Sequence, residues 1–261
     1  MIGTVAGIRA RMPGAPVVVM GAIAAAWAVA IAAEATGEAQ FLGHSALIHS
    51  GLPLVGALGV FVLAWQLMIA AMMLPSSLPL IRLFRVAAAG QQRPGRATAA
   101  LVAGYATVWT AFGVLAFVGD VGLHKLVHAW PWLAAHPQLI TGSVLALAGA
   151  FQFSELKERC LTECRHPGSF LVQHYGRGAT AAFRLGRIHG MFCLGCCWAL
   201  MLVGFAAGVA NLWWMAALTA LMVFEKTGRG GDRGVLPIGA GLILASAIVL
   251  LVPGLPLLGT T

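Results

Sequence analysis

The chain has 261 residues, of which 60% are apolar and only 9% are charged, and its mean hydropathy is +0.89. A soluble domain carries roughly 25% charged residues, so this composition excludes an ordinary soluble protein and predicts an integral membrane protein. The formal net charge of +8 is also high enough for nucleic-acid binding. However, the basic residues lie between long apolar runs and lack the interleaved aromatic residues of a nucleic-acid groove. We therefore interpret them as determinants of membrane topology and expect no nucleic-acid partner.

Apolar runs along the chain predict an all-α bundle of transmembrane helices. An uninterrupted span needs about 20 apolar residues, and small residues such as the 33 glycines of this chain let spanning helices pack closely. Judged by that length, the runs predict about seven spans in a single integral membrane domain that covers residues 1–261. They lie near 17–33, 54–74, 98–118, 138–153, 189–209, 212–224 and 235–252. The fourth and sixth runs are short, so either could be a half-helix or a re-entrant segment.

The first run has two interpretations. It follows Arg9 and Arg11 and ends in the small residues Ala32 and Ala33, as a cleaved signal peptide does. The run is long for the apolar core of a signal peptide, which favours a retained helix.

The basic residues segregate to one side of the predicted spans. Lysines and arginines in short loops stay in the cytoplasm during insertion, so their distribution predicts orientation. If seven spans alternate in direction, 15 of the 16 basic residues fall in one set of segments and only Lys125 falls in the other. This asymmetry predicts a cytoplasmic amino terminus and an external carboxyl terminus.

Sulfur-bearing side chains gather at the predicted cytoplasmic ends of three spans. The second span ends with Met68, Met72 and Met73, just before Pro75. Cys160 and Cys164 follow the fourth span and share one face of a short amphipathic helix that we expect over residues 156–164. The fifth span begins with donors at helical spacing, namely His189, Cys193, Cys196, Cys197 and Met201. We therefore expect thiols, thioethers and an imidazole to meet at one depth in the inner leaflet.

This donor set predicts a site for a soft metal ion. Thiolates and thioethers suit copper(I), zinc or iron–sulfur clusters and are poorly matched to magnesium or calcium. Copper(I) is the first choice. Zinc is the alternative, because Cys160, Cys164, Cys193 and Cys196 could supply a tetrahedral set in which the methionines play no part. The candidate ligands are Cys193, Cys196, Cys197, Cys160, Cys164, His189, Met72 and Met73.

Two other interpretations of the same residues stay open. Buried cysteine and methionine commonly act as packing residues, which is the simpler explanation for Met68 and Met201. A C-x-x-C pair can also exchange disulfides, but cytoplasmic thiols are normally kept reduced, so exchange with secreted substrates is disfavoured. Redox sensing from the inner side is compatible with the predicted topology.

Polar residues outside the sulfur-rich segments give two weaker signals. The predicted outer side holds five of the eight histidines, and Asp120, His124 and His128 are spaced four residues apart, as in a modest exterior metal site. Solvated loop histidines are the simpler interpretation; the five are His44, His49, His124, His128 and His136. At the inner end of the sixth span, Glu225 and Lys226 could anchor the helix at the interface or pair with neighbouring loops. Glu225 could also be an oxygen ligand.

Several of these strings resemble a bacterial family of uncharacterised proteins described as predicted metal-binding integral membrane proteins. The resemblance rests on Met68–Pro75, on Phe151–Lys157 with the cysteines that follow, on Cys193–Met201 and on Asn211–Lys226, and it covers roughly residues 55–226. It implies a multi-pass protein of the bacterial inner membrane that binds a metal, and it names no substrate.

The functional hypothesis is a protein that handles copper(I) or a similar soft metal at a site near the cytoplasmic leaflet. No phosphate-binding glycine loop or aspartyl phosphorylation loop is present, so transport would be passive, ion-coupled or chaperone-like. The alternatives are a membrane enzyme, an assembly factor or accessory subunit of a metal-dependent membrane complex, and a thiol redox sensor. Expected partners are membrane lipid and a metallochaperone or membrane protein complex.

Overall fold

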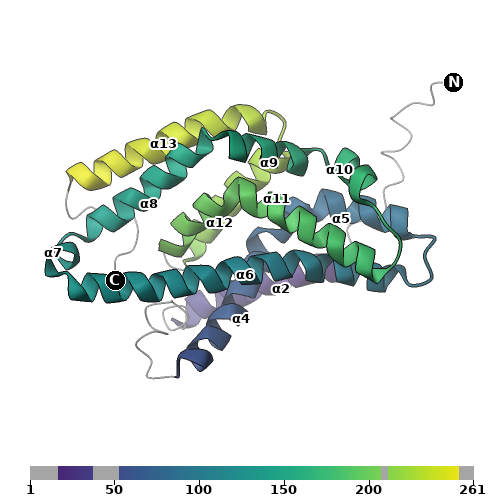
Figure 1. Cartoon of the computed structure of the whole chain (residues 1–261), viewed down its shortest axis with the longest axis horizontal. Helices are drawn as coiled ribbons and strands as arrows, with labels where there is room; N and C mark the ends of the chain where they lie inside the picture. The colour runs from purple at the N-terminus through teal and green to yellow at the C-terminus, as the bar shows by residue number, and fades with distance from the viewer. Residues whose placement is uncertain (1–16, 38–52, 207–210, 253–261) are drawn as a thin grey trace.

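The computed structural model describes residues 17–37, 53–206 and 211–252, and within these ranges all regular structure is helical. Figure 1 shows a long, layered bundle in which α8 and α13 lie side by side along one edge and α6 runs the length of the opposite edge. The helices are α2 (Val17–Thr36), α4 (Leu54–Met72), α5 (Leu74–Ala88), α6 (Pro94–Ala129), α7 (Pro131–Ala134), α8 (Pro137–Gln152), α9 (Glu155–Arg165), α10 (Pro167–His174), α11 (Ala179–Ala206), α12 (Leu212–Thr227) and α13 (Gly231–Leu251).

Five of these helices, α2, α4, α6, α11 and α13, are long and apolar enough to cross a membrane. Helices α8 and α9 pass the same test only as a pair and are bent by 65° at their junction, and α12 has 16 residues. A helix therefore covers most of each of the seven predicted spans, but length and composition support five crossings, or six if the bent pair is one span. The short amphipathic helix expected over residues 156–164 is confirmed as α9, and α10 and the first residues of α11 make most of residues 166–187 helical as well.

Two short breaks direct the chain around the bundle. Pro75 lies in the first turn of α5, where a missing backbone N–H costs nothing, so the helix restarts directly after Met73. At the second break the Ser154 hydroxyl accepts a hydrogen bond from the Lys157 backbone N–H at 3.2 Å, as a helix N-cap does. Helix α9 therefore leaves the direction of α8 and packs against α11.

Helices α6 and α11 make the most intimate contact in the bundle. A methyl group added to Gly104 would collide with the Phe183 backbone carbonyl, and one added to Gly186 would collide with the Leu101 carbonyl. Only glycine permits such close approach of two helix backbones. A third glycine, Gly195, lies against the Cys160 side chain of α9, so α11 accepts close neighbours on two sides.

We predict that Gly104→Ala or Gly186→Ala destabilises the protein, because rigid backbone rather than a flexible side chain occupies the space. Overpacking of this kind costs on the order of 1–3 kcal/mol. The matched control is Gly119→Ala, in the same α6, where no atom lies within 4 Å of the added methyl. We expect the control to be neutral or stabilised by up to about 1 kcal/mol, because alanine is the better helix former. Thermal unfolding in detergent measures all three, and equal stability of the three variants would contradict the close crossing.

Candidate metal site

All five cysteines are free thiols and all are buried. Cys193, Cys196 and Cys197 are at most 1% exposed, and Cys160 and Cys164 are 7% and 8% exposed. The three thiols of α11 span little more than one turn, and their neighbours come from α9, α12, Tyr105 of α6 and Met73 at the break between α4 and α5. The thiols therefore lie inside the protein rather than on its apolar exterior.

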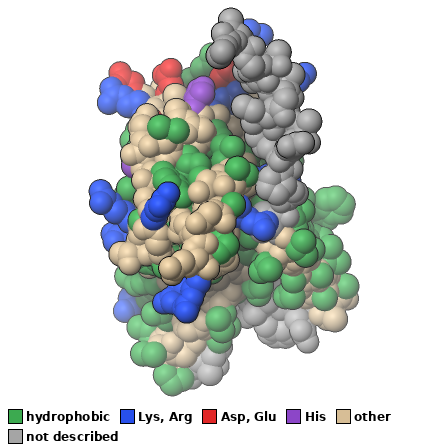
Figure 2. Space-filling model, turned by 90° about the vertical axis from the view of Figure 1, so that its right-hand side faces the viewer, with side chains coloured by type: hydrophobic (Ala, Val, Ile, Leu, Met, Phe, Trp, Pro, Cys, Tyr) green, Lys and Arg blue, Asp and Glu red, His purple; other side chains and the backbone are tan. Residues whose placement is uncertain are grey.

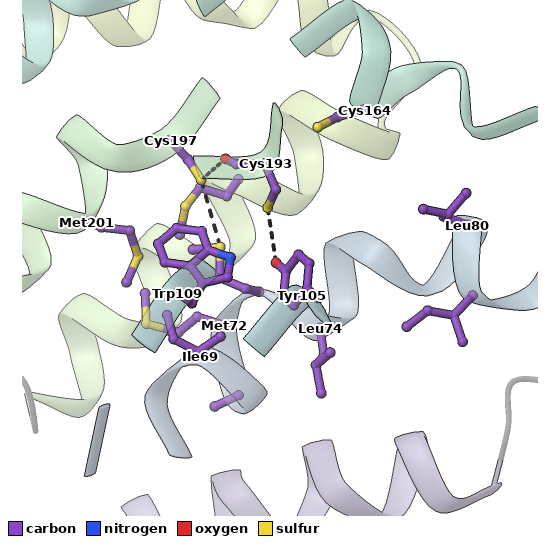
Figure 3. Packing of buried hydrophobic residues seen from close by; sticks show 14 of the residues in the cluster. Ile69, Met72, Leu74, Leu80, Tyr105, Trp109, Cys164, Cys193, Cys197 and Met201 are labelled. Carbon is purple, nitrogen blue, oxygen red and sulfur yellow. Dashed lines mark hydrogen bonds between the residues drawn. The ribbon is translucent and has the colours of Figure 1, made fainter. Parts of the chain in front are cut away.

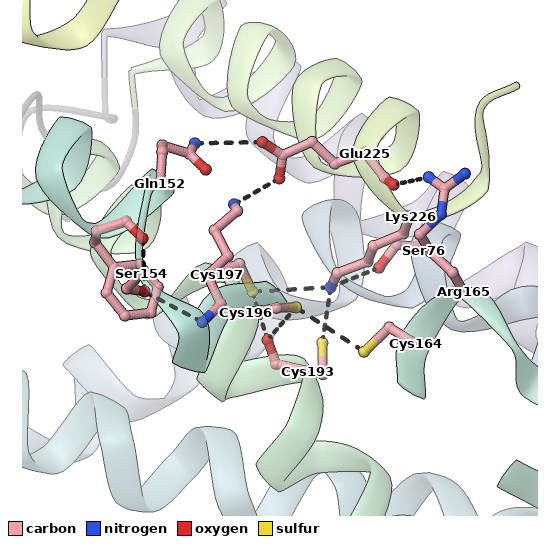
Figure 4. A network of polar contacts seen from close by, with 12 residues as sticks. Ser76, Gln152, Ser154, Cys164, Arg165, Cys193, Cys196, Cys197, Glu225 and Lys226 are labelled. Carbon is pink, nitrogen blue, oxygen red and sulfur yellow. Dashed lines mark hydrogen bonds and ion pairs between the residues drawn. The ribbon is translucent and has the colours of Figure 1, made fainter. Parts of the chain in front are cut away.

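The structure joins the two cysteine-bearing stretches of the sequence. Cys164 Sγ on α9 lies 3.9 Å from Cys196 Sγ on α11, and the two side chains point towards each other in Figure 4. Cys160, one turn earlier on α9, packs against Gly195 beside them. The expectation that these stretches meet is confirmed for the Cys164–Cys196 pair.

A second pair of sulfur atoms joins α11 to the break between α4 and α5. Cys197 Sγ lies 3.9 Å from Met73 Sδ, and Met73 is completely buried. Met72 is 1% exposed in the same core, where Figure 3 shows it among Ile69, Trp109 and the cysteines. The Cys196 and Cys197 thiols also donate hydrogen bonds to the Cys193 backbone carbonyl, at 3.1 and 2.7 Å.

A buried lysine lies among the thiols. Lys226 Nζ is 3.0 Å from Cys193 Sγ, 3.8 Å from Cys197 Sγ and 3.3 Å from the Ser76 hydroxyl, and the residue is 5% exposed. Figure 4 shows its ammonium group reaching from α12 into the cluster. The Tyr105 hydroxyl approaches Cys193 Sγ at 3.0 Å. An ammonium group is the natural electrostatic complement of buried thiolates.

A second buried charge network holds α9 against α12. Lys157 Nζ donates to a Glu225 carboxylate oxygen at 2.8 Å, and these residues are 1% and 2% exposed. The Gln152 amide donates to the other Glu225 oxygen at 3.2 Å. The Arg165 guanidinium donates to the backbone carbonyls of Glu225 and Gly228. The sequence suggested that Glu225 and Lys226 could be interfacial anchors, but both are buried within the bundle.

His189 occupies a different place from the one expected. It lies ten residues into α11, which begins at Ala179, so the prediction that it stands at the start of a helix is wrong. Its ring stacks on Tyr105 and meets Phe170 edge-on, and its Nε2 is 3.2 Å from the Ser77 hydroxyl. Tyr105 thus contacts both His189 and Cys193, which are one turn apart on α11.

The outer histidines form no joint site among the described residues. His124 Nδ1 is 3.4 Å from a carboxylate oxygen of Asp120, one turn earlier on α6. His136 bonds the Trp132 carbonyl at 2.7 Å and packs on that indole ring. His44 and His49 lie outside the described residues.

Two pairs of sulfur atoms lie close together at the candidate site. Cys164 Sγ and Cys196 Sγ are 3.9 Å apart, as are Cys197 Sγ and Met73 Sδ. Cys193, one of the four cysteines of the zinc alternative, is turned to Tyr105 and Lys226. Within the described ranges, no three His, Cys, Asp or Glu side chains gather in an arrangement that could hold a metal ion.

The described helices thus bring buried thiols, a thioether and an ammonium group together inside an apolar bundle. Residues 62–249 match the PpoB2 family, which is described as a copper chaperone, and the chain belongs to this family. No curated protein and no solved structure matches the chain.

Sequence reasoning missed four polar residues around the thiols. Tyr105, Ser76 and Ser77 lie on other helices and contact the cluster or His189, and Lys157 is the partner of Glu225. A tyrosine inside an apolar run and a lysine two residues after Glu155, just beyond the fourth predicted span, were the available signals. Neither indicates a partner, because the contacts join helices far apart in the sequence.

We predict that Glu225→Gln strongly destabilises the protein, because Lys157 would be left buried without its counter-charge. Removing one partner of a buried pair costs on the order of 3–5 kcal/mol. The double variant Lys157→Met/Glu225→Leu should be more stable than Glu225→Gln. The control is Glu155→Gln, which breaks the exposed Glu155–Arg159 pair and should change little. Thermal unfolding in detergent provides the measurement, and a Glu225→Gln variant as stable as the control would contradict the buried pair.

Proposed function

We propose that the chain is a membrane-embedded copper(I) chaperone that holds the ion on thiols between α9 and α11 and passes it to a partner protein. The observation that carries this proposal is the 3.9 Å approach of Cys164 to Cys196 in a member of a copper chaperone family. Five helices long and apolar enough to span a bilayer support the membrane placement. The basic-residue distribution supports a site near the cytoplasmic face of a bacterial inner membrane.

The proposed ligands divide into two sulfur pairs and their neighbours. Cys164 and Cys196 form the first pair, and Cys197 and Met73 form the second. Cys193 Sγ contacts the Lys226 ammonium group, and Cys160 lies one turn from Cys164 on α9. Met72, next to Met73 in the chain, and His189, stacked on Tyr105, are both buried, and we propose that they support the cluster rather than bind the ion first.

The two sulfur pairs share α11, and this arrangement favours transfer of copper(I) over its storage. Copper(I) is a soft ion that suits thiolate and thioether donors. A pair holds it with two bonds, so an incoming thiol from a partner needs to displace few ligands. Cys160 and Cys164 lie on the short α9, which joins the bundle at its edge, so we propose that they form the exit side. The expected partner is a protein with its own thiol or thioether copper site.

We predict that Cys164→Ser/Cys196→Ser lowers copper(I) affinity by at least about 100-fold, because losing supporting contacts alone costs 10–100-fold at metal sites. The measurement is competition of the detergent-purified protein with a chromophoric copper(I) chelator. Met215→Leu, which replaces a buried sulfur on α12 outside both pairs, should bind like the wild type. Wild-type affinity in the double serine variant would remove the proposed site.

We also predict that Lys226→Met weakens copper(I) binding at least ten-fold, whereas Lys226→Arg retains most of it. Copper(I) on two thiolates carries one net negative charge, and a buried negative charge is costly unless it is paired. The arginine variant keeps the positive charge but changes the shape of the side chain. Comparing the two variants therefore separates the effect of charge from the effect of shape. Chelator competition again measures the effect. Equal or tighter binding in Lys226→Met would show that the ammonium group is a competitor of the metal and not its complement.

A thiol redox sensor is the second candidate, and the Cys164–Cys196 distance favours it as well. Oxidation would join the two sulfurs in a disulfide and release two protons and two electrons to an acceptor such as a quinone. Such a sensor would form this disulfide in an oxidant-dependent manner and would bind copper(I) no more tightly than the double serine variant. The chelator competition therefore separates the two candidates.

A further inference from the structure

A cavity of about 470 Å³ opens away from the thiol cluster, between the α5–α6 connection and the α10–α11 connection. Its lining comes from residues 90–93 and 96–97 on one side and from residues 177–179 on the other. The size falls in the range of small-molecule sites, about 300–1,000 Å³. The copper proposal makes no use of this region.

Hydrogen bonds fasten the two connections to each other. The Gln91 side-chain amide donates to the Tyr175 hydroxyl at 3.1 Å, and the Gly178 backbone N–H donates to the Gln91 side-chain oxygen at 3.0 Å. The Tyr175 hydroxyl in turn donates to the Ala87 carbonyl at 2.8 Å. Gly178 has a φ of +90°, a conformation that favours glycine, and α11 starts at the next residue. The rim of the cavity is thus built by specific contacts.

The cavity is strongly basic. Arg93, Arg96 and Arg177 line it, and no Asp or Glu is among the lining residues. Within the described part of the chain, no ion pair involves any of these three arginines. Figure 2 looks onto this end of the molecule, where Lys and Arg side chains are spread over the face and the visible acidic side chains lie at its upper edge. An anionic ligand would therefore meet three guanidinium groups without a competing carboxylate.

The backbone adds positive potential at the same place. Both α6, which begins at Pro94, and α11, which begins at Ala179, start at the cavity. The first turn of a helix presents N–H groups that have no partner within the helix, and the helix dipole is positive at this end. Two helix starts beside three arginines complement a phosphate group better than a carboxylate, because phosphate offers more acceptor oxygens to bidentate guanidinium groups.

We propose that this arginine-lined cavity binds a phosphate group, carried either by an anionic lipid headgroup or by a free phosphate compound. The basic-residue distribution predicts that this end faces the cytoplasmic leaflet, where anionic headgroups are available. Arginines that only obey the topology rule would be solvated separately. Here three exposed arginines line the same cavity, whose rim is fastened by the hydrogen bonds of Gln91 with Tyr175 and Gly178.

The test compares three detergent-purified proteins, namely the wild type, Arg93→Gln/Arg96→Gln/Arg177→Gln, and the control Arg82→Gln/Arg85→Gln/Arg184→Gln. The control removes the same charge from three exposed arginines outside the cavity. One arm titrates inorganic phosphate and the other titrates dioleoylphosphatidylglycerol against dioleoylphosphatidylcholine. The unfolding midpoint and the number of lipids retained in native mass spectrometry are the readouts.

We expect the wild type and the control to be stabilised by the ligand, and the cavity variant to lose at least ten-fold in apparent affinity. A response to inorganic phosphate alone identifies a free phosphate compound, a response to phosphatidylglycerol alone identifies a headgroup, and a response to both identifies the phosphate group itself. Equal responses in all three proteins, or none in the wild type, would overturn the proposal.

Two further measurements keep the test interpretable. Arg93→Lys/Arg96→Lys/Arg177→Lys keeps the charge but lacks the planar fork, so we expect binding intermediate between the wild type and the glutamine variant. If the glutamine variant does not fold, the lysine variant tests the proposal instead. Wild-type affinity of the lysine variant for both ligands would contradict a site that depends on the geometry of the arginine guanidinium groups. Copper(I) affinity should be unchanged in the cavity variants, so failure here leaves the copper proposal intact.

Discussion

The close crossing of α6 and α11 is the constraint on which the rest of the structure depends. Gly104 and Gly186 bring the two backbones into direct contact, which no residue with a Cβ would allow. The crossing sets Tyr105 beside the buried face of α11, where its hydroxyl reaches Cys193 and its ring stacks on His189. Gly195 repeats the same device towards α9 and gives Cys160 its place. The absence of a side chain at Gly104, Gly186 and Gly195 thus determines how closely the helices approach and where the thiols can lie.

Burying a charged side chain inside this apolar bundle costs free energy, so each buried charge needs a partner or a function. Lys157 and Glu225 neutralise each other and fix α9 on α12, while Arg165 caps carbonyl groups at the end of α12. Lys226, by contrast, forms no ion pair with a carboxylate in the described part of the chain and instead faces thiols and a hydroxyl. A buried cation among soft donors is poorly explained by packing alone, since an apolar side chain would be less costly there. It is well explained if the thiols carry negative charge when they hold their cargo.

Helix α11 connects the two regions that we propose bind ligands. Its first residue lies at the arginine-lined cavity, and Cys193 lies 14 residues later, about 21 Å along the axis at 1.5 Å per residue. The arginine-lined cavity and the sulfur pairs are therefore distinct in position and in chemistry, one lined by cationic groups and the other by soft donors. The cavity lies where α6 and α11 begin, whereas the sulfur pairs lie where the end of α9 and the break at Met73 meet the interior of α11.

The sequence alone determined the helical class, the membrane character of the long apolar runs and the soft-donor chemistry of the cysteine segments, because these follow from composition and from spacing along one helix. It also indicated that the stretches containing Cys164 and Cys196 belong together. Only the tertiary structure decided that Cys164 and Cys196 approach as a pair, that Cys193 turns to Lys226, and that Tyr105 contacts both His189 and Cys193. The amphipathic helix expected over residues 156–164 is present as α9, but its packing against α11 and α12 could not be read from the sequence. Contacts between distant helices depend on crossing geometry and on glycine positions, and neither is encoded in the periodicity of a single segment.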